Sequence, residues 1–288
     1  VSRAEDNITR KAQWDLDFVA SSHEWSLKLP EVSEEEQILL DTTSKNGTGT
    51  LIVWERVDRL LKSYNAIGSA RNALNRKIDQ LQFHVSMVYQ RFLDQDDNRA
   101  ANVNITINDV NIEAWDPFAR KEELTELLAE DTVEVDMPDG TCPCFTMRAF
   151  MLPNKDSFST SKAMKDARIS NDMQGFYVYR ENRLIHYGDW LGMFINEPHG
   201  SLLRVEFSFD HELDAAFNVD IKKSRILPAE EIVDHIKTKF IPAPRRAAED
   251  RYRHGTAKNV LQRAEKRDAH AESNRNIEEK AKTVEGAK

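Results

Sequence analysis

The chain is predicted to be a mixed α/β protein (α+β), in which strands and helices follow one another along most of its length. Three observations predict this class. Residues 202–209 alternate apolar and polar side chains, as a half-buried strand does. Residues 175–187 have the pattern of a hairpin with its turn at Arg180-Glu181-Asn182. Between Leu74 and Phe92, apolar residues recur every three or four positions, which is the period of a helix.

Size and composition are those of a folded protein of about two domains. The 288 residues are 40% hydrophobic, and the apolar residues are sparse in the charged stretch at the end of the chain. The formal net charge of -9 disfavours nucleic-acid binding over the whole surface, because phosphate contacts require clustered Lys and Arg. A local basic stripe remains compatible with this charge.

The two cysteines, Cys142 and Cys144, are too few for a disulfide framework. A Cys-Pro-Cys spacing without a nearby histidine is also a poor zinc half-site, so reduced and partly buried thiols are expected. No apolar run is long enough to span a membrane, and the chain begins with Val1 and polar residues rather than an initiator Met or a signal peptide. We expect a cytoplasmic protein, represented by a fragment, that contacts no membrane.

Residues 1–54 are predicted to be rich in β-structure. Four stretches have alternating or β-branched character: 13–19, 24–29, 37–42 and 50–54. The turn at 44–47 precedes the last of them and is typical of a hairpin. A block of this size is too short to bury a two-layer core by itself. We therefore expect it to be the closing part of a larger domain.

Residues 55–100 are predicted to form connecting helices, divided at Gly68-Ser69. A hairpin is expected over 103–115, with its turn at Asn108-Asp109. It is followed by Asp116-Pro117-Phe118, where the proline removes a donor from the strand ladder and the phenylalanine is expected to anchor the connection in the core.

The remaining elements alternate in the same way. They are a short acidic helix over 120–129, strands over 132–135 and 145–151, a helix over 159–168 and an amphipathic helix over 229–240. Pro242 and Pro244 are interpreted as a boundary. Residues 242–288 are predicted to be a charged tail, for which a solvated helix, a partner-dependent coil, a disordered segment and a DNA-contacting helix all remain open.

Several motifs occur in a fixed order between about residues 40 and 240. They are Gly49-Thr50 at the start of a strand, Asp116-Pro117-Phe118, the run from Gly175 to Ile185, and the strand from Ala216 that leads into Lys222-Lys223-Ser224-Arg225. In this order they resemble the second domain of the GHKL ATPases, the superfamily of DNA gyrase B, MutL and the MORC proteins. The resemblance is greatest to the MORC-like group.

The resemblance implies a ribosomal-protein-like transducer fold over 101–241. The closing strands of a GHKL nucleotide-binding domain (1–54) and connecting helices (55–100) precede it, and the charged helix or disordered tail (242–288) follows. The implied function is that of an ATP-dependent dimerising clamp, in which this part couples ATP binding and hydrolysis to a conformational change. It further implies a homodimer, ATP and Mg²⁺ in the full-length protein, and DNA or anti-phage defence as the setting, by analogy of fold.

The resemblance also implies site residues. In this superfamily a loop lysine of the transducer reaches the γ-phosphate of ATP, and Lys223 is the first choice for that role, with Lys222 and Arg225 as alternates. A compact cation at a strand end stabilises the charge of a transferring phosphoryl group. Thr50 is implied to help read the adenine, and Gly49 to permit close backbone approach. A solvated strand end is the plain alternative for the lysines.

The sequence departs from the family where the nucleotide should be held. The helix-borne Glu and Asn, the Asp-x-Gly-x-Gly turn and the glycine-rich lid have no counterpart. We therefore expect the chain alone neither to bind nor to hydrolyse ATP. The main alternative function is a non-catalytic nucleic-acid or protein interaction module with the same fold.

Two further groups of residues have both a functional and a plain interpretation. The aromatic hairpin of 176–190 is interpreted as a sheet packed on helices rather than as a platform for bases. An acidic group is interpreted as a solvated surface rather than as a metal site of a self-contained enzyme. Its members are Asp116, Glu122, Glu123, Glu126, Glu130 and Asp131.

Overall fold

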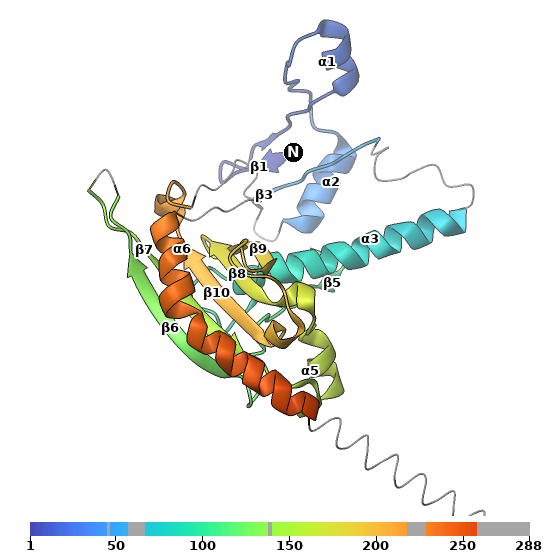
Figure 1. Cartoon of the computed structure of the whole chain (residues 1–288). Coiled ribbons are helices and arrows are strands. Elements are labelled where there is room, and N and C mark those ends of the chain that lie inside the picture. Colours follow the sequence, from blue (N-terminus) through green and yellow to red (C-terminus); the bar gives the residue numbers. More distant parts are fainter. Residues whose placement is uncertain (45–46, 57–66, 138–139, 218–228, 258–288) are drawn as a thin grey trace, which may run out of the picture. The chain divides into compact units, whose positions relative to one another are not determined.

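The computed structural model describes residues 1–44, 47–56, 67–137, 140–217 and 229–257 (Figure 1). The chain divides into two compact units, Val1–Leu74 and Asn75–Lys288, and each is described by itself. The division falls within helix α3 (Ile67–Val88), whose first turn contains Gly68 and Ser69. The residues before α3 lie outside the described ranges, so the division of 55–100 at these two residues stays a prediction. In the described ranges, no helix is both long and apolar enough to cross a membrane.

The longer elements of the first unit are helices, contrary to the β-rich prediction. Helix α1 (Leu16–Ser22) and helix α2 (Glu34–Thr43) replace the strands expected over 13–19 and 37–42. The strands are two residues long: β1 (Ser2–Arg3), β2 (Thr9–Arg10) and β3 (Gly49–Thr50), in the order β2-β1-β3. From the expected strand over 24–29, only an isolated bridge between Gln13 and Lys28 forms.

Helix capping explains why the strand patterns failed. The Asp15 side chain accepts a hydrogen bond from Phe18 N at the start of α1. Ser33 and Glu36 form a reciprocal capping box at the start of α2, and three glutamates in its first turn complement the helix dipole. The Ser-x-x-Glu spacing is visible in the sequence and predicts this helix start, which periodicity alone had missed.

Large apolar side chains of the first unit lie mostly at its surface. Ten of them are half or more exposed: Ile8, Trp14, Leu16, Trp25, Leu29, Ile38, Leu39, Ile52, Val53 and Trp54. Among the described residues of this unit, only Leu40 and Ala73 are buried hydrophobics. The unit therefore has little core of its own, as its small size predicts.

A five-stranded mixed sheet forms the centre of the second unit, which confirms the mixed α/β class. Its strands are β6 (Glu126–Glu134), β7 (Cys144–Met151), β8 (Gly175–Arg180), β9 (Arg183–Asp189) and β10 (Leu203–Phe209). The order is β6-β7-β10-β8-β9; β8 and β10 are parallel, and the other neighbours are antiparallel. Strand β10 is thus the central strand.

Two of the three predicted hairpins form, whereas the one with its turn at 44–47 does not, because the residues before it form helix α2. Strands β8 and β9 turn at Glu181 and Asn182, which have φ values of 49° and 65°. Strands β4 (Thr106–Ile107) and β5 (Val110–Asn111) turn at Asn108 and Asp109, with φ values of 50° and 63°. Two successive left-handed residues match the twist of a tight antiparallel pair.

The acidic helix predicted over 120–129 was wrong. Its second half belongs to β6, which pairs with β7 from Glu126 to Glu134. The pairing supplies the backbone hydrogen bonds that an isolated helical turn would otherwise provide, so tertiary context overrides the local helix propensity of the glutamates. The helix expected over 159–168 forms as α5 (Ser161–Asp166), capped by Thr160.

Helices cover one face of the sheet. Its residues, among them Phe145, Val205 and Phe207, pack against α6 (Glu230–His235) and the π-helical turn Ile236–Phe240. A further helix over 242–257 contributes Ala248, which is fully buried in this core (Figure 1). Pro242 and Pro244 lie in the first turn of that helix, where a missing N–H costs little. This part of the expected charged tail is therefore packed on the sheet.

The opposite face packs against the end of α3 and the loops around it. Met87 and Val88 of α3 contact a cluster that includes Phe118, Tyr177 and Tyr179. Helix α4 (Gln90–Leu93) follows immediately. Short 3₁₀ turns complete the unit: Lys155–Ser157, Asn171–Met173, Pro198–Gly200 and His211–Leu213.

Phe118 anchors its connection, as predicted, because its side chain is 0% exposed and its ring lies 4.8 Å from that of Phe150. We predict that Phe118→Ala lowers the free energy of unfolding by about 3–5 kcal/mol, the cost of emptying a buried aromatic site. Urea unfolding of purified protein measures this loss. Ile195→Ala, at a side chain 78% exposed, is the control. Equal stabilities of the two variants would contradict the packing of Phe118.

Candidate functional site

The lysine segment proposed from the sequence lies outside the described residues. Lys222, Lys223 and Arg225 all fall within 218–228. The described residues on either side are held by burial and by a backbone hydrogen bond, however. Phe217 is 0% exposed, and the backbone N–H of Ala229 donates to the carbonyl of Ala216 at 3.1 Å. The described residues on the two sides of the segment are therefore close to each other.

Gly49 and Thr50 form β3 in the first unit, where they pair with Arg3 and Ser2. The side chain of Thr50 is exposed. A Cβ atom at Gly49 would lie 3.1 Å from Cβ of Ser44, so the glycine here serves the close approach of β3 to the end of α2. The lysine segment lies outside the described residues, so the nucleotide contact expected from Gly49 and Thr50 together with it stays a prediction.

The largest concentration of buried charge lies on the central strand, where the sequence had suggested a strand with one solvated face. Arg204 and Glu206 of β10 are 0% and 2% exposed. The alternation was read correctly, but both faces of β10 are buried. Apolar residues face α6 and the helix 242–257. On the other face, Glu206 and Ser208 contact Arg91 of α4, and Arg204 donates to the backbone carbonyls of Pro117 and Ala167.

Glu206 is the centre of an ion cluster, which we call the Glu206 cluster: Arg91, Arg99, Arg148 and Glu206, with Asp97. Oε1 of Glu206 lies 3.3 Å from Nη2 of Arg91 and 2.8 Å from Nη1 of Arg99, and it also accepts from Arg148. Asp97 accepts two further hydrogen bonds from the guanidinium of Arg99. With three arginines and two carboxylates, the cluster carries a formal charge of +1.

Arg91 ties α4 to the sheet. Its guanidinium donates to Asn182 at 3.0 Å and to Ser208 at 2.6 Å, and it stacks 3.7 Å from the centre of the Tyr179 ring. The adjacent Gln90 accepts a hydrogen bond from the Tyr179 hydroxyl at 3.1 Å. The end of the α3–α4 segment is therefore bound to β8, β10 and the β8–β9 turn at once.

The charges of the cluster shift its acid–base equilibria. Burial acts to raise the pKa of Glu206, but the positive charges of Arg91, Arg99 and Arg148 outweigh it and hold the pKa below its usual range. Burial also acts to raise the pKa of Asp97, and the hydrogen bonds from Arg99 lower it to about 2. Both carboxylates therefore stay ionised at neutral pH.

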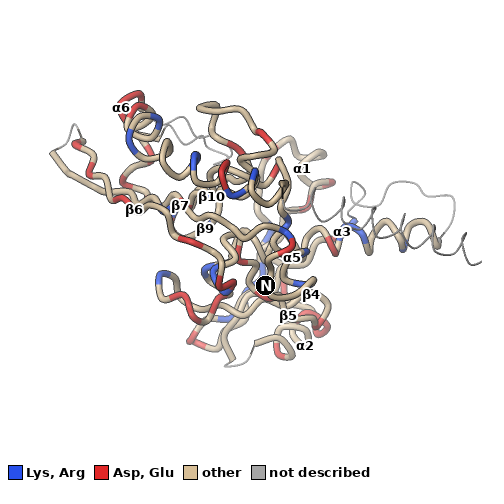
Figure 2. Tube along the Cα trace, turned by 60° about the horizontal axis from the view of Figure 1, so that its bottom comes forward, with Lys and Arg blue, Asp and Glu red and all other residues tan. Residues whose placement is uncertain are grey.

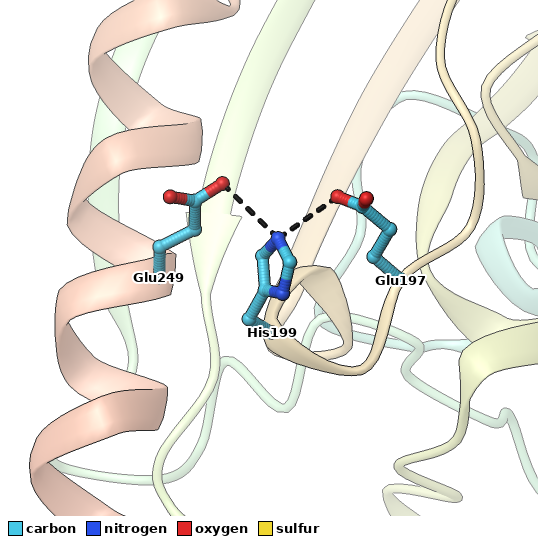
Figure 3. Close-up of side chains that lie close together, drawn as sticks. All are labelled: Glu197, His199 and Glu249. Carbon is cyan, nitrogen blue, oxygen red and sulfur yellow. Dashed lines mark ion pairs between the residues drawn. The ribbon is translucent and has the colours of Figure 1, made fainter.

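A second cluster lies on the other side of the sheet, at the helix 242–257. Nε2 of His199 lies 2.8 Å from Oε2 of Glu197 and 3.3 Å from Oε1 of Glu249 (Figure 3). Nη2 of Arg245 lies 2.8 Å from the same oxygen of Glu197. Among the described residues, Glu197, His199 and Glu249 are the group of three whose ligand atoms have the spacing of a metal site.

The sequence analysis missed both clusters. Polar residues at every second position of 204–208 gave the signal for the first, but it was taken as a sign of solvent exposure. The second joins residues about fifty positions apart, so no local spacing reveals it. Only the Glu-Pro-His step at 197–199 is visible in the chain.

The other expectations have mixed outcomes. The hairpin aromatics Phe176, Tyr177 and Tyr179 are 0% exposed and are divided between the two faces, which confirms the packed-sheet interpretation. Cys142 and Cys144 are free but exposed, so the prediction of partial burial was wrong.

The acidic group predicted to be a solvated surface forms separate pairs rather than a metal centre in the described part of the chain. Asp116 accepts hydrogen bonds from Arg120, and Glu122 accepts them from Ser159. Asp131 lies 2.7 Å from His235, and Glu126 pairs with Arg251.

No protein-family model, curated protein or solved structure matches the chain. The functional assignment therefore rests on the sequence motifs and on the geometry described above.

We predict that Glu206→Gln lowers the free energy of unfolding by about 3–5 kcal/mol, because a neutral amide leaves buried arginine charges uncompensated. The control is Glu181→Gln, which removes a carboxylate that is 48% exposed and pairs with His211. An exposed pair contributes about 0–1 kcal/mol. Urea unfolding curves at neutral pH measure both losses. A Glu206→Gln loss as small as that of Glu181→Gln would show that the cluster is not a centre of stability.

Asp97 predicts a specific acid response. Its pKa of about 2 lies below the ordinary value of 3.8, so its stabilisation is complete above the ordinary pKa and is lost as the pH falls through the lowered one. We expect the difference in unfolding free energy between wild type and Asp97→Asn to be largest at neutral pH and to shrink below about pH 4. Unfolding curves recorded from pH 7 downward measure it. A difference that stays constant with pH would contradict the assignment.

Proposed function

We propose that the chain is the transducer part of an ATP-dependent, GHKL-type dimerising clamp that couples ATP binding and hydrolysis to a conformational change. The setting proposed is a DNA-related or anti-phage process in the cytoplasm. The full-length protein forms a homodimer in this proposal. ATP and Mg²⁺ are bound by the nucleotide-binding domain that the sequence resemblance implies. Lys223 then reaches the γ-phosphate from the transducer side.

The observation that carries this proposal is the fixed base of the lysine segment. Phe217 directly precedes the segment, and its ring lies 4.4 Å from that of Phe209 and 5.2 Å from that of Phe207. The hydrogen bond between Ala216 and Ala229 joins its two ends. A charge that stabilises a transferring phosphoryl group acts only from a defined position, so its support has to be rigid.

The Glu206 cluster supports the coupling role. Strand β10 has a contact on each of its two faces. Glu206, at its middle, pairs with Arg91 of α4, the helix that follows α3. Phe209, at its end, packs against Phe217, the residue that precedes the lysine segment in sequence. Helix α3 contributes residues to both compact units. A displacement of α3 would therefore act on the strand that bears the base of the segment. Such a shared rigid element is what transmission between two sites requires.

The first unit supports the same proposal in a different way. Its exposed tryptophans and aliphatic side chains are the surface expected of closing strands and helices that pack against the rest of a nucleotide-binding domain. The exposed Thr50 fits a single contact with a nucleotide. In the ranges that the structure describes, no cluster of metal ligands lies in this unit, so we assign Mg²⁺ and the activation of water to the nucleotide-binding domain that the resemblance implies.

The charge distribution bears on a DNA substrate. Lys and Arg alternate with Asp and Glu along the described elements rather than gathering in one long basic element (Figure 2). A clamp that encloses DNA needs few phosphate contacts, whereas a module that grips DNA directly needs clustered cations. The mixed charges therefore favour the clamp over the nucleic-acid-binding module.

We predict that Lys223→Ala in the full-length protein lowers the rate of ATP turnover by roughly 10²-fold, by analogy with the loss of one charge-stabilising donor. Fold stability should change little. Lys222→Ala should be milder, because successive side chains of a strand point to opposite faces. Phosphate release at saturating ATP, with a parallel thermal unfolding curve, measures both effects.

The control for this experiment is Lys155→Ala, at an exposed lysine of a 3₁₀ turn. Wild-type turnover in both Lys222→Ala and Lys223→Ala would remove the lysine from the mechanism. A full-length protein that neither binds nor hydrolyses ATP would favour the non-catalytic interaction module instead.

A further inference from the structure

His199 stands apart from the other histidines of the second unit that contact acids. His186, His211 and His235 each lie beside one carboxylate. His199 faces two, from Glu197 in the loop before β10 and from Glu249 in the helix 242–257 (Figure 3). The three ligand atoms lie within 4.8 Å of one another, and the three residues are only partly exposed.

The chemistry of this donor set is that of a transition-metal site. One imidazole nitrogen and two carboxylate oxygens are ligands that Zn²⁺ accepts, with open positions left for water. Arg245 and Arg253 contribute two positive charges against the two carboxylates, so the group has no net charge when the imidazole is neutral. Binding of a divalent ion would therefore rest on the donor atoms rather than on an excess of negative charge.

The loop that carries two of the ligands is held in place by a buried side chain. Gln174 is 1% exposed; its Nε2 donates to the carbonyl of Glu197 at 3.0 Å, and its Oε1 accepts from the N–H of Glu197 at 3.3 Å. A Cβ atom at Gly200 would lie 2.5 Å from the same Oε1, so a larger residue at this position would displace the Gln174 amide. The backbone of Glu197 is thus held in place by the Gln174 amide.

Arg245 fixes the position of the helix 242–257, which carries Glu249, the third proposed ligand. Its guanidinium lies 4.9 Å from the centre of the Phe194 ring, 2.8 Å from Oε2 of Glu197 and 3.6 Å from Oε1 of Glu249. Oε2 of Glu197, which lies beside Arg245, is also the oxygen that lies beside Nε2 of His199. The arginine thus orients the carboxylate at the proposed site, as outer groups orient metal ligands.

We propose that Glu197, His199 and Glu249 bind a divalent transition-metal ion of the Zn²⁺ class, which fastens the helix 242–257 to the loop before β10. The ion joins segments about fifty residues apart and adds to the apolar packing of Ala248 on the sheet. This site lies apart from the proposed ATP chemistry and does not depend on it.

The test uses the purified chain after dialysis against EDTA, with ZnCl₂ as the probe in isothermal titration calorimetry. All proteins carry Cys142→Ser and Cys144→Ser, because two exposed thiols bind zinc by themselves. We expect one Zn²⁺ per chain and a higher Tm in its presence. His199→Ala and Glu249→Gln should each weaken binding about tenfold or more. His235→Ala, which removes a histidine beside a single carboxylate, should bind as tightly as the parent.

Amide hydrogen exchange gives a second measurement that does not depend on affinity. Zn²⁺ should slow exchange in 242–257 in the parent and in His235→Ala, but not in His199→Ala. Tm values without metal establish that each variant is folded. If His199→Ala is not folded, His199→Gln replaces it, because glutamine keeps a hydrogen-bonding side chain. Absence of zinc binding, or equal binding by the parent and the His199 and Glu249 variants, overturns the site. Unchanged exchange on zinc binding overturns the fastening of the helix.

Discussion

The buried carboxylate of Glu206 is the interaction on which the second unit depends. It lies at the middle of the central strand, and three arginines reach it from different parts of the chain: Arg91 after α3, Arg99 from the following loop and Arg148 from β7. Arg91 and Arg99 lie eight residues apart, whereas Arg148 comes from a distant part of the chain. The position of the α3–α4 segment on the sheet is therefore fixed by charge at one point, and the surrounding aromatic side chains fill the space around it.

The cluster specifies an arrangement more than it adds net stability. Removing ions from water is costly, and Oε2 of Glu206 and Nε of Arg91 are buried without a hydrogen-bond partner among the described residues. Well-packed apolar residues in place of such ions are often as stabilising. Arginine and carboxylate groups pair with a defined geometry, so the ions favour one arrangement of α4 on β10.

The sequence predicts this fold where local patterns and tertiary context agree. The hairpin turns at Asn108 and Glu181, the central strand and the burial of Phe118 followed from periodicity and turn chemistry. Periodicity gave wrong predictions in two places. In 1–54, the capping box at Ser33 stabilises a helix where a strand was expected. At 120–129, pairing with β7 stabilises a strand where a helix was expected. The charged residues of β10 were predicted to be solvated because alternation indicates one buried face. The pattern does not show whether other elements cover the polar face.

The two faces of the sheet are held by different means. The α3 face is held by a charge cluster whose carboxylates remain ionised at neutral pH. The other face holds the helix 242–257 through apolar packing and through the partly exposed group at His199. The base of the lysine segment, Phe217, packs in this second core with Phe207 and Phe209. The two cores therefore meet at β10, whose polar side contacts Arg91 and whose apolar side contacts Phe217.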